Sequence, residues 1–145
     1  MRLDHAALMV SSPEAARAFY VGVLGLEEIA RPPTFTFPGL WVRVGDRQLH
    51  LIGEASAGRA RETHPGYAQR ELATGYASHF ALEVPDLEAF LGGVRARGGV
   101  VVGGPRPRGD GVLQAYVEDP DGNVVELMQS GVPVTGAEPE IGTPR

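Results

Sequence analysis

The chain contains no cysteine among its 145 residues. Disulfide frameworks, thiolate zinc sites and cysteine nucleophiles are therefore excluded. It also lacks an apolar run of the roughly 18 residues needed to cross a bilayer, so no membrane-spanning helix is expected. The first residues have neither the basic nor the apolar segment of a signal peptide. These absences together predict a cytoplasmic protein without a membrane partner.

Lysine is absent as well, and all 13 basic residues are arginine. Against 18 acidic residues they leave a net charge of −5, which argues against a nucleic-acid partner. With 43% apolar and 21% charged residues, the composition is that of a globular protein. The length predicts one domain, or two half-size units that share a core.

The most informative feature is an internal repeat. Residues 3–10 resemble residues 77–84 at an offset of 74, and this offset places His5 opposite His79. Continued to Gly25 and Gly99, it pairs identical residues at seven of 23 positions. The local structure signals repeat with the same offset, which strengthens the comparison.

Each half begins with a strand of alternating character, followed by a helix start at Ser12-Pro13 or at Asp86. Glycines at 25 and 98–99 end these helices. Three short strands then follow in each half, near 26–31, 40–45 and 47–53, and near 99–103, 112–118 and 123–129. The sequence thus predicts an α+β fold of two tandem βαβββ modules. A unit of about 50 residues is too small to be stable alone, so the two must pair and close a shared cavity.

The remaining segments join and follow the modules. We expect a single domain over 1–130, with module one at 1–53, a polar linker at 54–76 and module two at 77–129. The linker has a short helix predicted near 67–72, and its His64 is best interpreted as a surface residue. Residues 131–145 form a Pro/Gly-rich C-terminal tail, expected to pack on its own domain or on a neighbouring chain.

Four polar residues occupy equivalent places in the repeat. His5 and His79 lie on the first strands, and His50 and Glu126 lie on the last strands. Each shares its strand face with mainly apolar side chains, where an unpaired charge is costly. A shared divalent cation would satisfy all four, and three imidazoles with one carboxylate suit Ni²⁺, Fe²⁺, Co²⁺, Zn²⁺ or Mn²⁺. The alternatives are ordinary hydrogen-bonded histidines with a solvent-facing glutamate, or a three-ligand site without His50.

Several motifs resemble one known family, the vicinal oxygen chelate superfamily, which includes glyoxalase I, extradiol dioxygenases, fosfomycin-modifying enzymes and bleomycin-resistance proteins. The resemblance covers about residues 1–130 and is strongest at 116–127. The other matching segments are Leu3-Asp4-His5, Ala18-Phe19-Tyr20, Leu24-Gly25-Leu26 and residues 79–84. It implies a cupped, mostly antiparallel sheet around one divalent metal whose ligands are His5, His50, His79 and Glu126.

The resemblance also implies a function. It indicates a metal-dependent lyase, isomerase or oxygenase acting on a small oxygenated substrate that chelates the metal, with Glu126 as catalytic base. A glyoxalase-like lyase is favoured over an extradiol dioxygenase-like enzyme. Glyoxalase I usually has Glu or Gln in place of His50, whereas dioxygenases and fosfomycin enzymes use a set matching His5, His79 and Glu126. The family usually forms homodimers. The alternative is a bleomycin-resistance-type binding protein that sequesters a drug or metabolite.

Further residues are candidates for substrate binding. Phe35 and Phe37 lie in the loop 31–39, and Arg106 and Arg108 lie in the corresponding loop 106–111. Arginines of this kind bind carboxylates or phosphates, although pairing with Asp110 is the simpler interpretation. Middle-strand candidates are Trp41, Arg43 and Tyr116, whose orientation depends on strand register.

Overall fold

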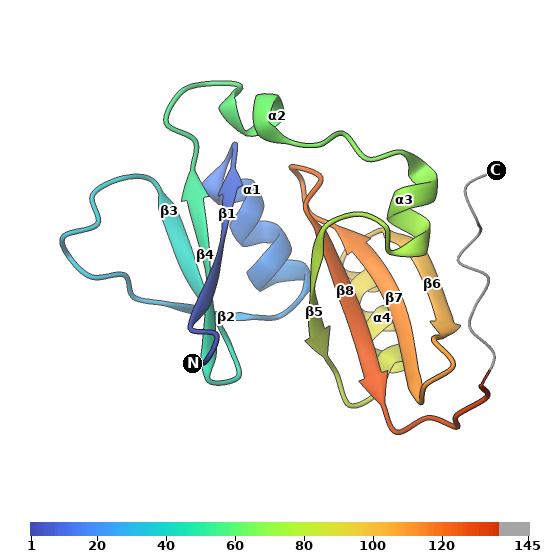
Figure 1. Ribbon diagram of the computed structural model, residues 1–145. Helices are drawn as coiled ribbons and strands as arrows, with labels where there is room; N and C mark the ends of the chain where they lie inside the picture. Colours follow the sequence, from blue (N-terminus) through green and yellow to red (C-terminus); the bar gives the residue numbers. More distant parts are fainter. Residues whose placement is uncertain (137–145) are drawn as a thin grey trace. The chain divides into compact units, whose positions relative to one another are not determined.

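The computed structural model describes residues 1–136 (Figure 1). The chain divides into two compact units, one of residues 1–65 with 119–122, and the other of residues 66–118 with the segment from 123 onward. Most of the expected C-terminal tail, residues 137–145, lies outside the described residues. No helix in the described part of the chain is long and apolar enough to span a bilayer.

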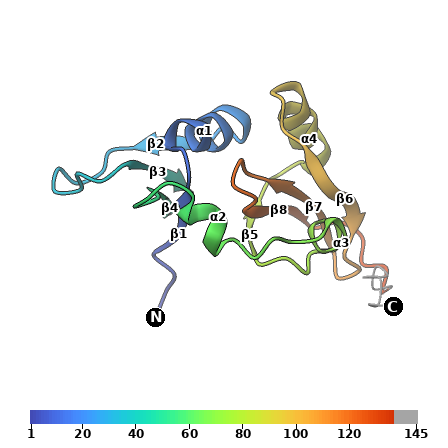
Figure 2. The ribbon, with the colours of Figure 1, turned by 90° about the horizontal axis from the view of Figure 1, so that it is seen from above.

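The first unit contains a four-stranded sheet in the order β1-β4-β3-β2. β1 runs parallel to β4, and the other neighbours are antiparallel. Its elements are β1 (His5–Val10), α1 (Pro13–Arg17), the π-helix η1 (Ala18–Val23), β2 (Glu27–Ile29), β3 (Gly39–Val44), β4 (Arg47–Gly53) and α2 (Arg59–Thr63). In Figure 2, α1 lies over one face of this sheet.

The second unit repeats this arrangement in a sheet of order β5-β8-β7-β6, with β5 parallel to β8. Its elements are α3 (Gln69–Thr74), β5 (His79–Glu83), α4 (Leu87–Ala96), β6 (Val101–Pro107), β7 (Val112–Glu118) and β8 (Val124–Ser130). The predicted α+β class and the βαβββ order of both halves are therefore confirmed. β6 extends further than expected, so Arg106 belongs to a strand rather than to a loop.

The helix starts match the sequence signals. The Ser12 hydroxyl accepts a hydrogen bond from Ala15 N–H, and the Asp86 carboxylate accepts one from Ala89 N–H. The predicted first helix is regular, but the structure widens it into a π-helix after Arg17. There Leu24 N–H donates to Phe19 O, five residues back, at 2.9 Å. Phe19, at this wider turn, is buried and contacts the ring of Tyr20 edge-on.

The linker contains more structure than the sequence predicted. Its first part forms α2, because the Glu54 carboxylate accepts hydrogen bonds from the N–H groups of Gly58 and Ala60. Its second part forms α3, which overlaps the expected helix and ends at Gly75 with φ +81°. Residues at and after α3 pack on the second sheet in a cluster of Leu72, Ala77, Tyr116 and Val124.

The turn between β7 and β8, residues 119–122, belongs to the first unit. The hydroxyl of Tyr20 donates to Asp119 Oδ2 at 2.8 Å, and both side chains are buried. The Asp121 carboxylate accepts from Ser11 N–H at 3.1 Å. His64 Nε2 donates to Gly122 O at 2.7 Å, so this histidine has a structural partner rather than the purely surface role expected. Three hydrogen-bonded positions therefore hold the turn.

Replacement of Tyr20 by phenylalanine tests this anchor. Burial raises the pKa of Tyr20, and the neighbouring Asp119 charge raises it further, so the hydroxyl remains a donor. Tyr20→Phe removes one hydrogen-bond donor from the buried Asp119 carboxylate, and we expect it to lower the free energy of unfolding by about 1–3 kcal/mol. Urea unfolding followed by tryptophan fluorescence measures the change. The exposed Tyr76→Phe is the matched control, and an equal effect of both variants would contradict the proposed anchor.

Candidate functional site

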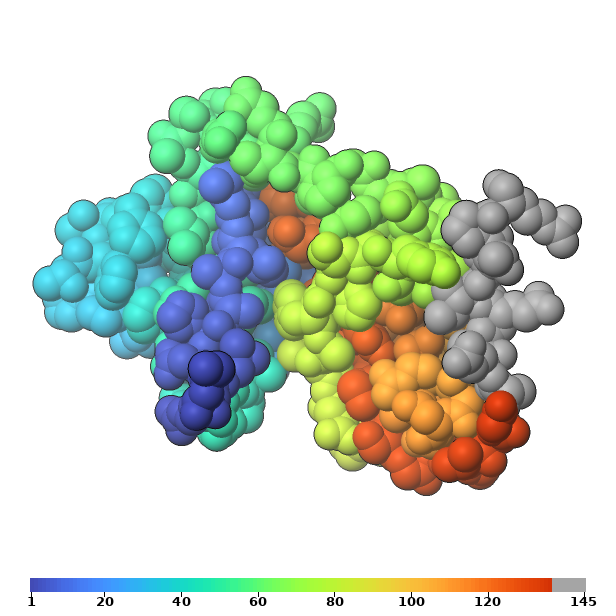
Figure 3. Space-filling view, in the orientation of Figure 1, coloured from blue at the N-terminus to red at the C-terminus, as the bar shows by residue number. Residues whose placement is uncertain are grey.

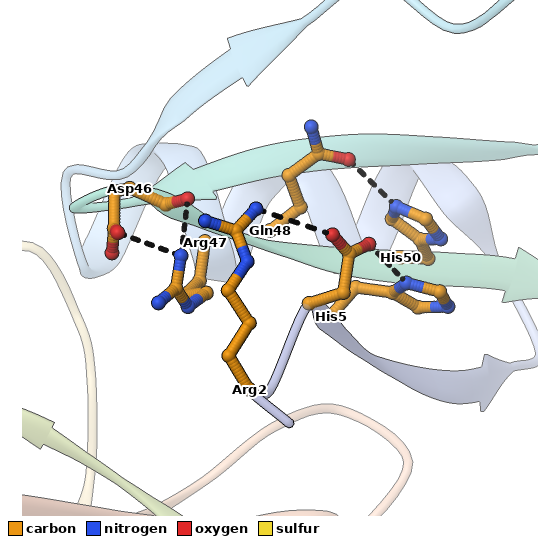
Figure 4. Close-up of polar contacts among 7 residues, drawn as sticks. Arg2, His5, Asp46, Arg47, Gln48 and His50 are labelled. Carbon is orange, nitrogen blue, oxygen red and sulfur yellow. Dashed lines mark hydrogen bonds and ion pairs between the residues drawn. The ribbon is translucent and has the colours of Figure 1, made fainter.

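The register of the first sheet places His5 and His50 on the same face. His5 pairs with Gln48 across β1 and β4, and the next position on this face pairs Ala7 with His50. The two imidazole rings stack with centroids 4.1 Å apart and planes 16° from parallel. His5 and His50 therefore lie on one face of this sheet (Figure 4).

His50 is also covered on its second side. The indole of Trp41, opposite it on β3, stacks at 3.8 Å with an interplanar angle of 4°. His50 Nε2 donates to Gln48 Oε1 at 2.9 Å, a contact visible in Figure 4. Burial lowers the pKa of His50, and the neighbouring His5 lowers it further, while Asp4 opposes the shift. In the neutral ring, Nδ1 therefore carries the lone pair.

His5 is oriented by the residue before it. Its Nδ1 donates to Asp4 Oδ2 at 2.9 Å, which leaves the Nε2 lone pair as the ligating atom. Metal-binding histidines usually donate their other ring N–H to a carboxylate or a carbonyl in this way. His5 therefore has the tautomer that a metal ligand requires.

The stacked pair cannot coordinate one ion together in this arrangement. The lone pair of an imidazole nitrogen lies in the plane of its ring. Because the planes of His5 and His50 are only 16° from parallel with centroids 4.1 Å apart, an ion in the plane of one ring lies outside the plane of the other. In each ring one nitrogen is hydrogen-bonded, Nδ1 of His5 to Asp4 and Nε2 of His50 to Gln48, and the opposite nitrogen carries the lone pair of the neutral ring.

The second unit brings the other two candidates together. His79 on β5 and Glu126 on β8 share a face, and His79 Nε2 lies 3.1 Å from Glu126 Oε2. His79 Nδ1 donates to the carbonyl of Ala77 at 2.7 Å. A carbonyl only accepts, so Nδ1 carries the proton and the neutral ring presents its Nε2 lone pair to the carboxylate. This contact is repulsive unless a proton or a metal cation lies between them.

Glu126 has an incomplete set of partners. Its side chain is only 6% exposed, and Oε1 is buried without a hydrogen-bond partner. The nearest charge at that oxygen is Arg108 Nη1, 3.7 Å away. Nitrogen and oxygen ligands lie about 2.0–2.2 Å from a metal such as zinc, so two neighbouring ligands are separated by roughly 3 Å. The donor pair His79–Glu126, with its orphaned buried oxygen, thus fits a divalent metal.

Among the described residues 1–136, no three His, Asp or Glu side chains form a single cluster able to hold a metal. The four expected ligands instead form two pairs, His5 with His50 in the first unit and His79 with Glu126 in the second. The four-ligand site therefore stays a prediction.

The aromatic candidates of the first unit form a continuous series of rings. Phe35 lies 5.3 Å from both Phe37 and Trp41, and the two phenylalanines are 37% and 40% exposed. They belong to the loop between β2 and β3, which is at the surface in Figure 3. Arg43 lies on the face of Trp41 and Gln48, where its Nε donates to Glu27 at 2.9 Å.

The polar candidates of the second unit already form some hydrogen bonds within the chain. Arg108 binds the Asp110 carboxylate through Nε and Nη2, as the simpler interpretation predicted. Arg106 Nη1 donates to Ala73 O at 2.9 Å, whereas its Nε and Nη2 are buried without partners. Tyr116 lies opposite Glu126, with its ring 5.5 Å from His79. Burial raises the pKa of Tyr116, and Glu126 raises it too, so Tyr116 remains a neutral hydroxyl.

Three supporting groups were not predicted from the sequence: Asp4, Gln48 and the carbonyl of Ala77. The sequence positions of two of them could have indicated their role. Asp4 immediately precedes His5, and Gln48 lies two residues before His50, where period-two alternation places it on the same face. The Ala77 carbonyl had no side-chain signal, because backbone acceptors are found only once the chain direction is known.

Comparison with known proteins identifies the family. Residues 2–127 match the model of the Glyoxalase/Bleomycin resistance protein/Dioxygenase superfamily. The chain belongs to this superfamily. The match spans both βαβββ units and contains every candidate ligand, and it confirms the resemblance drawn from the sequence motifs.

Two lactoylglutathione lyases are among the relatives of this chain. The chain is 35% identical over 134 residues to a lactoylglutathione lyase of Neisseria meningitidis, covering 89% of this chain and 91% of that protein. It is 28% identical over 133 residues to a lactoylglutathione lyase of Arabidopsis thaliana, covering 90% of this chain. Against the Arabidopsis protein the chain spans only 44% of the relative's length.

A solved structure shows the same fold with a different role. The antibiotic binding protein TnmS3 from Streptomyces sp. CB03234 superposes with a TM-score of 0.64 at 27% identity. The superposition covers 90% of this chain and 96% of that protein. The superfamily relatives of this chain thus include both lyases and a binding protein.

Proposed function

We propose that the protein is a metal-dependent glyoxalase-type lyase. In this proposal His5, His79 and Glu126 hold one divalent metal through His5 Nε2, His79 Nε2 and the Glu126 carboxylate. The observation that carries it is the contact between His79 Nε2 and Glu126 Oε2 at 3.1 Å, next to the buried Glu126 Oε1, which has no hydrogen-bond partner. His50 stays the fourth expected ligand of this set.

The candidate residues of the second unit have separate roles in this proposal. The metal, when bound, supplies Lewis-acid stabilisation of negative charge on a substrate oxygen. The Glu126 carboxylate accepts a proton from the substrate carbon and returns it to the neighbouring atom. Arg108 Nη1 lies 3.7 Å from Glu126 Oε1, and Asp110 holds Arg108 in place. Tyr116, opposite Glu126 in the strand register, stays a neutral phenol in this proposal.

The relatives suggest the substrate. Two of them are lactoylglutathione lyases, so the first candidate reaction interconverts lactoylglutathione with glutathione and methylglyoxal. Such a substrate carries neighbouring oxygens able to chelate a metal, which fits the expected class of small oxygenated substrates. A homodimer and a cytoplasmic location are part of the same proposal.

Metal content is the direct test. The protein is purified without a histidine tag or a chelator, and Mn, Fe, Co, Ni, Cu and Zn are quantified by mass spectrometry. We expect about one metal per site in the wild type and its loss in the double variant His5→Ala/Glu126→Ala. His64→Gln is the matched control, because this histidine binds the Gly122 carbonyl and should leave the metal content unchanged. Formation of the lactoyl thioester from methylglyoxal and glutathione is then assayed with the metal found.

The possible outcomes separate the parts of the proposal. Metal retained in the double variant would contradict the ligand assignment. Metal bound without thioester formation would contradict the lyase reaction while keeping the centre. A protein that contains no metal and takes up none of the six would contradict the enzyme proposal.

The last outcome favours the second candidate, a binding protein that sequesters a drug or metabolite. One observation supports it. The rings of Phe35 and Phe37 are exposed, and Phe35 lies 5.3 Å from both Phe37 and Trp41. The similarity to an antibiotic binding protein points in the same direction. Quenching of Trp41, the single tryptophan, by a planar aromatic compound in metal-free protein would be the supporting result.

A further inference from the structure

We propose that the C-terminal segment 131–136 is a positioning element of the candidate site. It orders the loop 108–111 between β6 and β7 and thereby holds Arg108 beside Glu126. This inference rests on the proposed function, because Glu126 is the base assigned there. Every contact that carries it lies within the second unit.

The first step is the contact between the C-terminal segment and the loop. Val132 N–H donates to the carbonyl of Gly111 at 3.2 Å. The N–H groups of Thr135 and Gly136 both donate to the carbonyl of Gly109, each at 3.2 Å. Gly109 and Gly111 are buried, whereas most of the C-terminal segment is exposed. The segment therefore covers the backbone of the loop and binds it at two carbonyls.

The second step is the flexibility of the loop itself. Asp110 lies between Gly109 and Gly111, whose φ angles are +96° and +90°. Glycine has more backbone freedom than any other residue, so a Gly-Asp-Gly sequence does not fix its own conformation. Arg108 N–H donates to Val112 O at 2.7 Å and closes the base of the loop. The hydrogen bonds from the C-terminal segment restrain the two glycines beyond that point.

The third step leads from the loop to Glu126. The Asp110 carboxylate accepts from Arg108 Nε at 3.1 Å and from Arg108 Nη2 at 3.0 Å. Because a guanidinium is planar, fixing this edge also fixes the direction of Nη1. Nη1 lies 3.7 Å from Glu126 Oε1, the buried oxygen without a hydrogen-bond partner. The C-terminal segment thus determines where a positive charge lies beside the proposed base.

Substitutions in the full-length chain test the proposal. Val132→Pro/Thr135→Pro removes two of the donated N–H groups, and Val132→Ala/Thr135→Ala keeps both as the matched control. We expect the double-proline variant to lower kcat/KM of the lyase reaction about tenfold, and the double-alanine variant to stay within about twofold of wild type. Asp110→Ala keeps the C-terminal segment but releases Arg108, and we expect it to lose about tenfold as well. Circular dichroism and urea unfolding establish that each variant is folded.

The Arg108→Ala background separates positioning from a general structural role. In this background we expect the double-proline substitution to lower kcat/KM by less than about twofold, because the group through which it acts is absent. Hydrogen exchange of the amide at residue 108 should become faster in the double-proline variant, and this readout does not depend on activity.

The outcomes distinguish this inference from the proposed function. An equal loss in both backgrounds would overturn the inference alone, as would wild-type kcat/KM in the double-proline variant or in Asp110→Ala. Unchanged hydrogen exchange in the double-proline variant would show that the segment does not order the loop. A wild-type protein without lyase activity would instead overturn the proposed function, and with it the role of Arg108 beside the base.

Discussion

Replacing Glu126 by glutamine is expected to lower turnover of the lyase reaction by about 10²–10⁴-fold while the protein remains folded. The amide keeps the size of the side chain but cannot accept a proton at neutral pH, and it is a weaker metal ligand. The fold should survive, because Arg108 retains its ion pair with Asp110 when the Glu126 charge is lost. Steady-state kinetics, metal content and circular dichroism together measure these effects.

Two further variants make the Glu126 result specific. Glu126→Asp keeps the charge but shortens the reach, and we expect it to recover part of the activity. Glu88→Gln removes an exposed carboxylate on α4 and should behave as wild type. A Glu126→Gln enzyme with wild-type kcat would rule out Glu126 as the base.

Replacing Gly75 by alanine is expected to destabilise the second unit by about 2–4 kcal/mol. Gly75 ends α3 with φ +81°, a conformation that costs any residue with a Cβ atom. The added methyl group would also meet the ring of Tyr116, with Cζ at 2.8 Å. Because Tyr116 contacts His79 and is buried in the α3 cluster, its displacement should also reduce metal affinity.

Two other glycines separate the causes of this loss. Gly66 has φ +68° with no atom within 4 Å of an added Cβ, so Gly66→Ala isolates the backbone cost of about 1 kcal/mol. Gly92 lies in α4 with equally open surroundings, and Gly92→Ala should be neutral or stabilising by up to about 1 kcal/mol. Equal losses for Gly75→Ala and Gly66→Ala, measured by urea unfolding, would show that the contact with Tyr116 is unimportant.

The βαβββ order of each half and the strands that carry the candidate ligands could be predicted from the sequence. The repeat placed His5 and His79 on the first strands and His50 and Glu126 on the last strands, and in the structure each first strand pairs with the last strand of its own unit. Capping residues such as Ser12 and Asp86 marked both helix starts, because their side chains satisfy local N–H groups. These features depend on near neighbours along the chain.

The features that could not be predicted depend on distant or backbone groups. The stacking of His50 between Trp41 and His5 requires the order of three strands as well as their faces. The helix α2 arises because Glu54 caps amides several residues ahead, a pattern that the polar composition of the linker concealed. A sequence pattern gives the face of a strand, but it does not give ring rotation.

The anchoring of the β7–β8 turn has a consequence for synthesis of the protein. Tyr20 and Asp119 are 99 residues apart, and the first unit is complete only when residues 119–122 join it. At about 5–20 residues per second, the ribosome delivers this turn several seconds after residue 65. During that interval the emerging N-terminal segment lacks the acceptor for its buried tyrosine. Cotranslational folding of the N-terminal half is thus coupled to nearly the whole length of the chain.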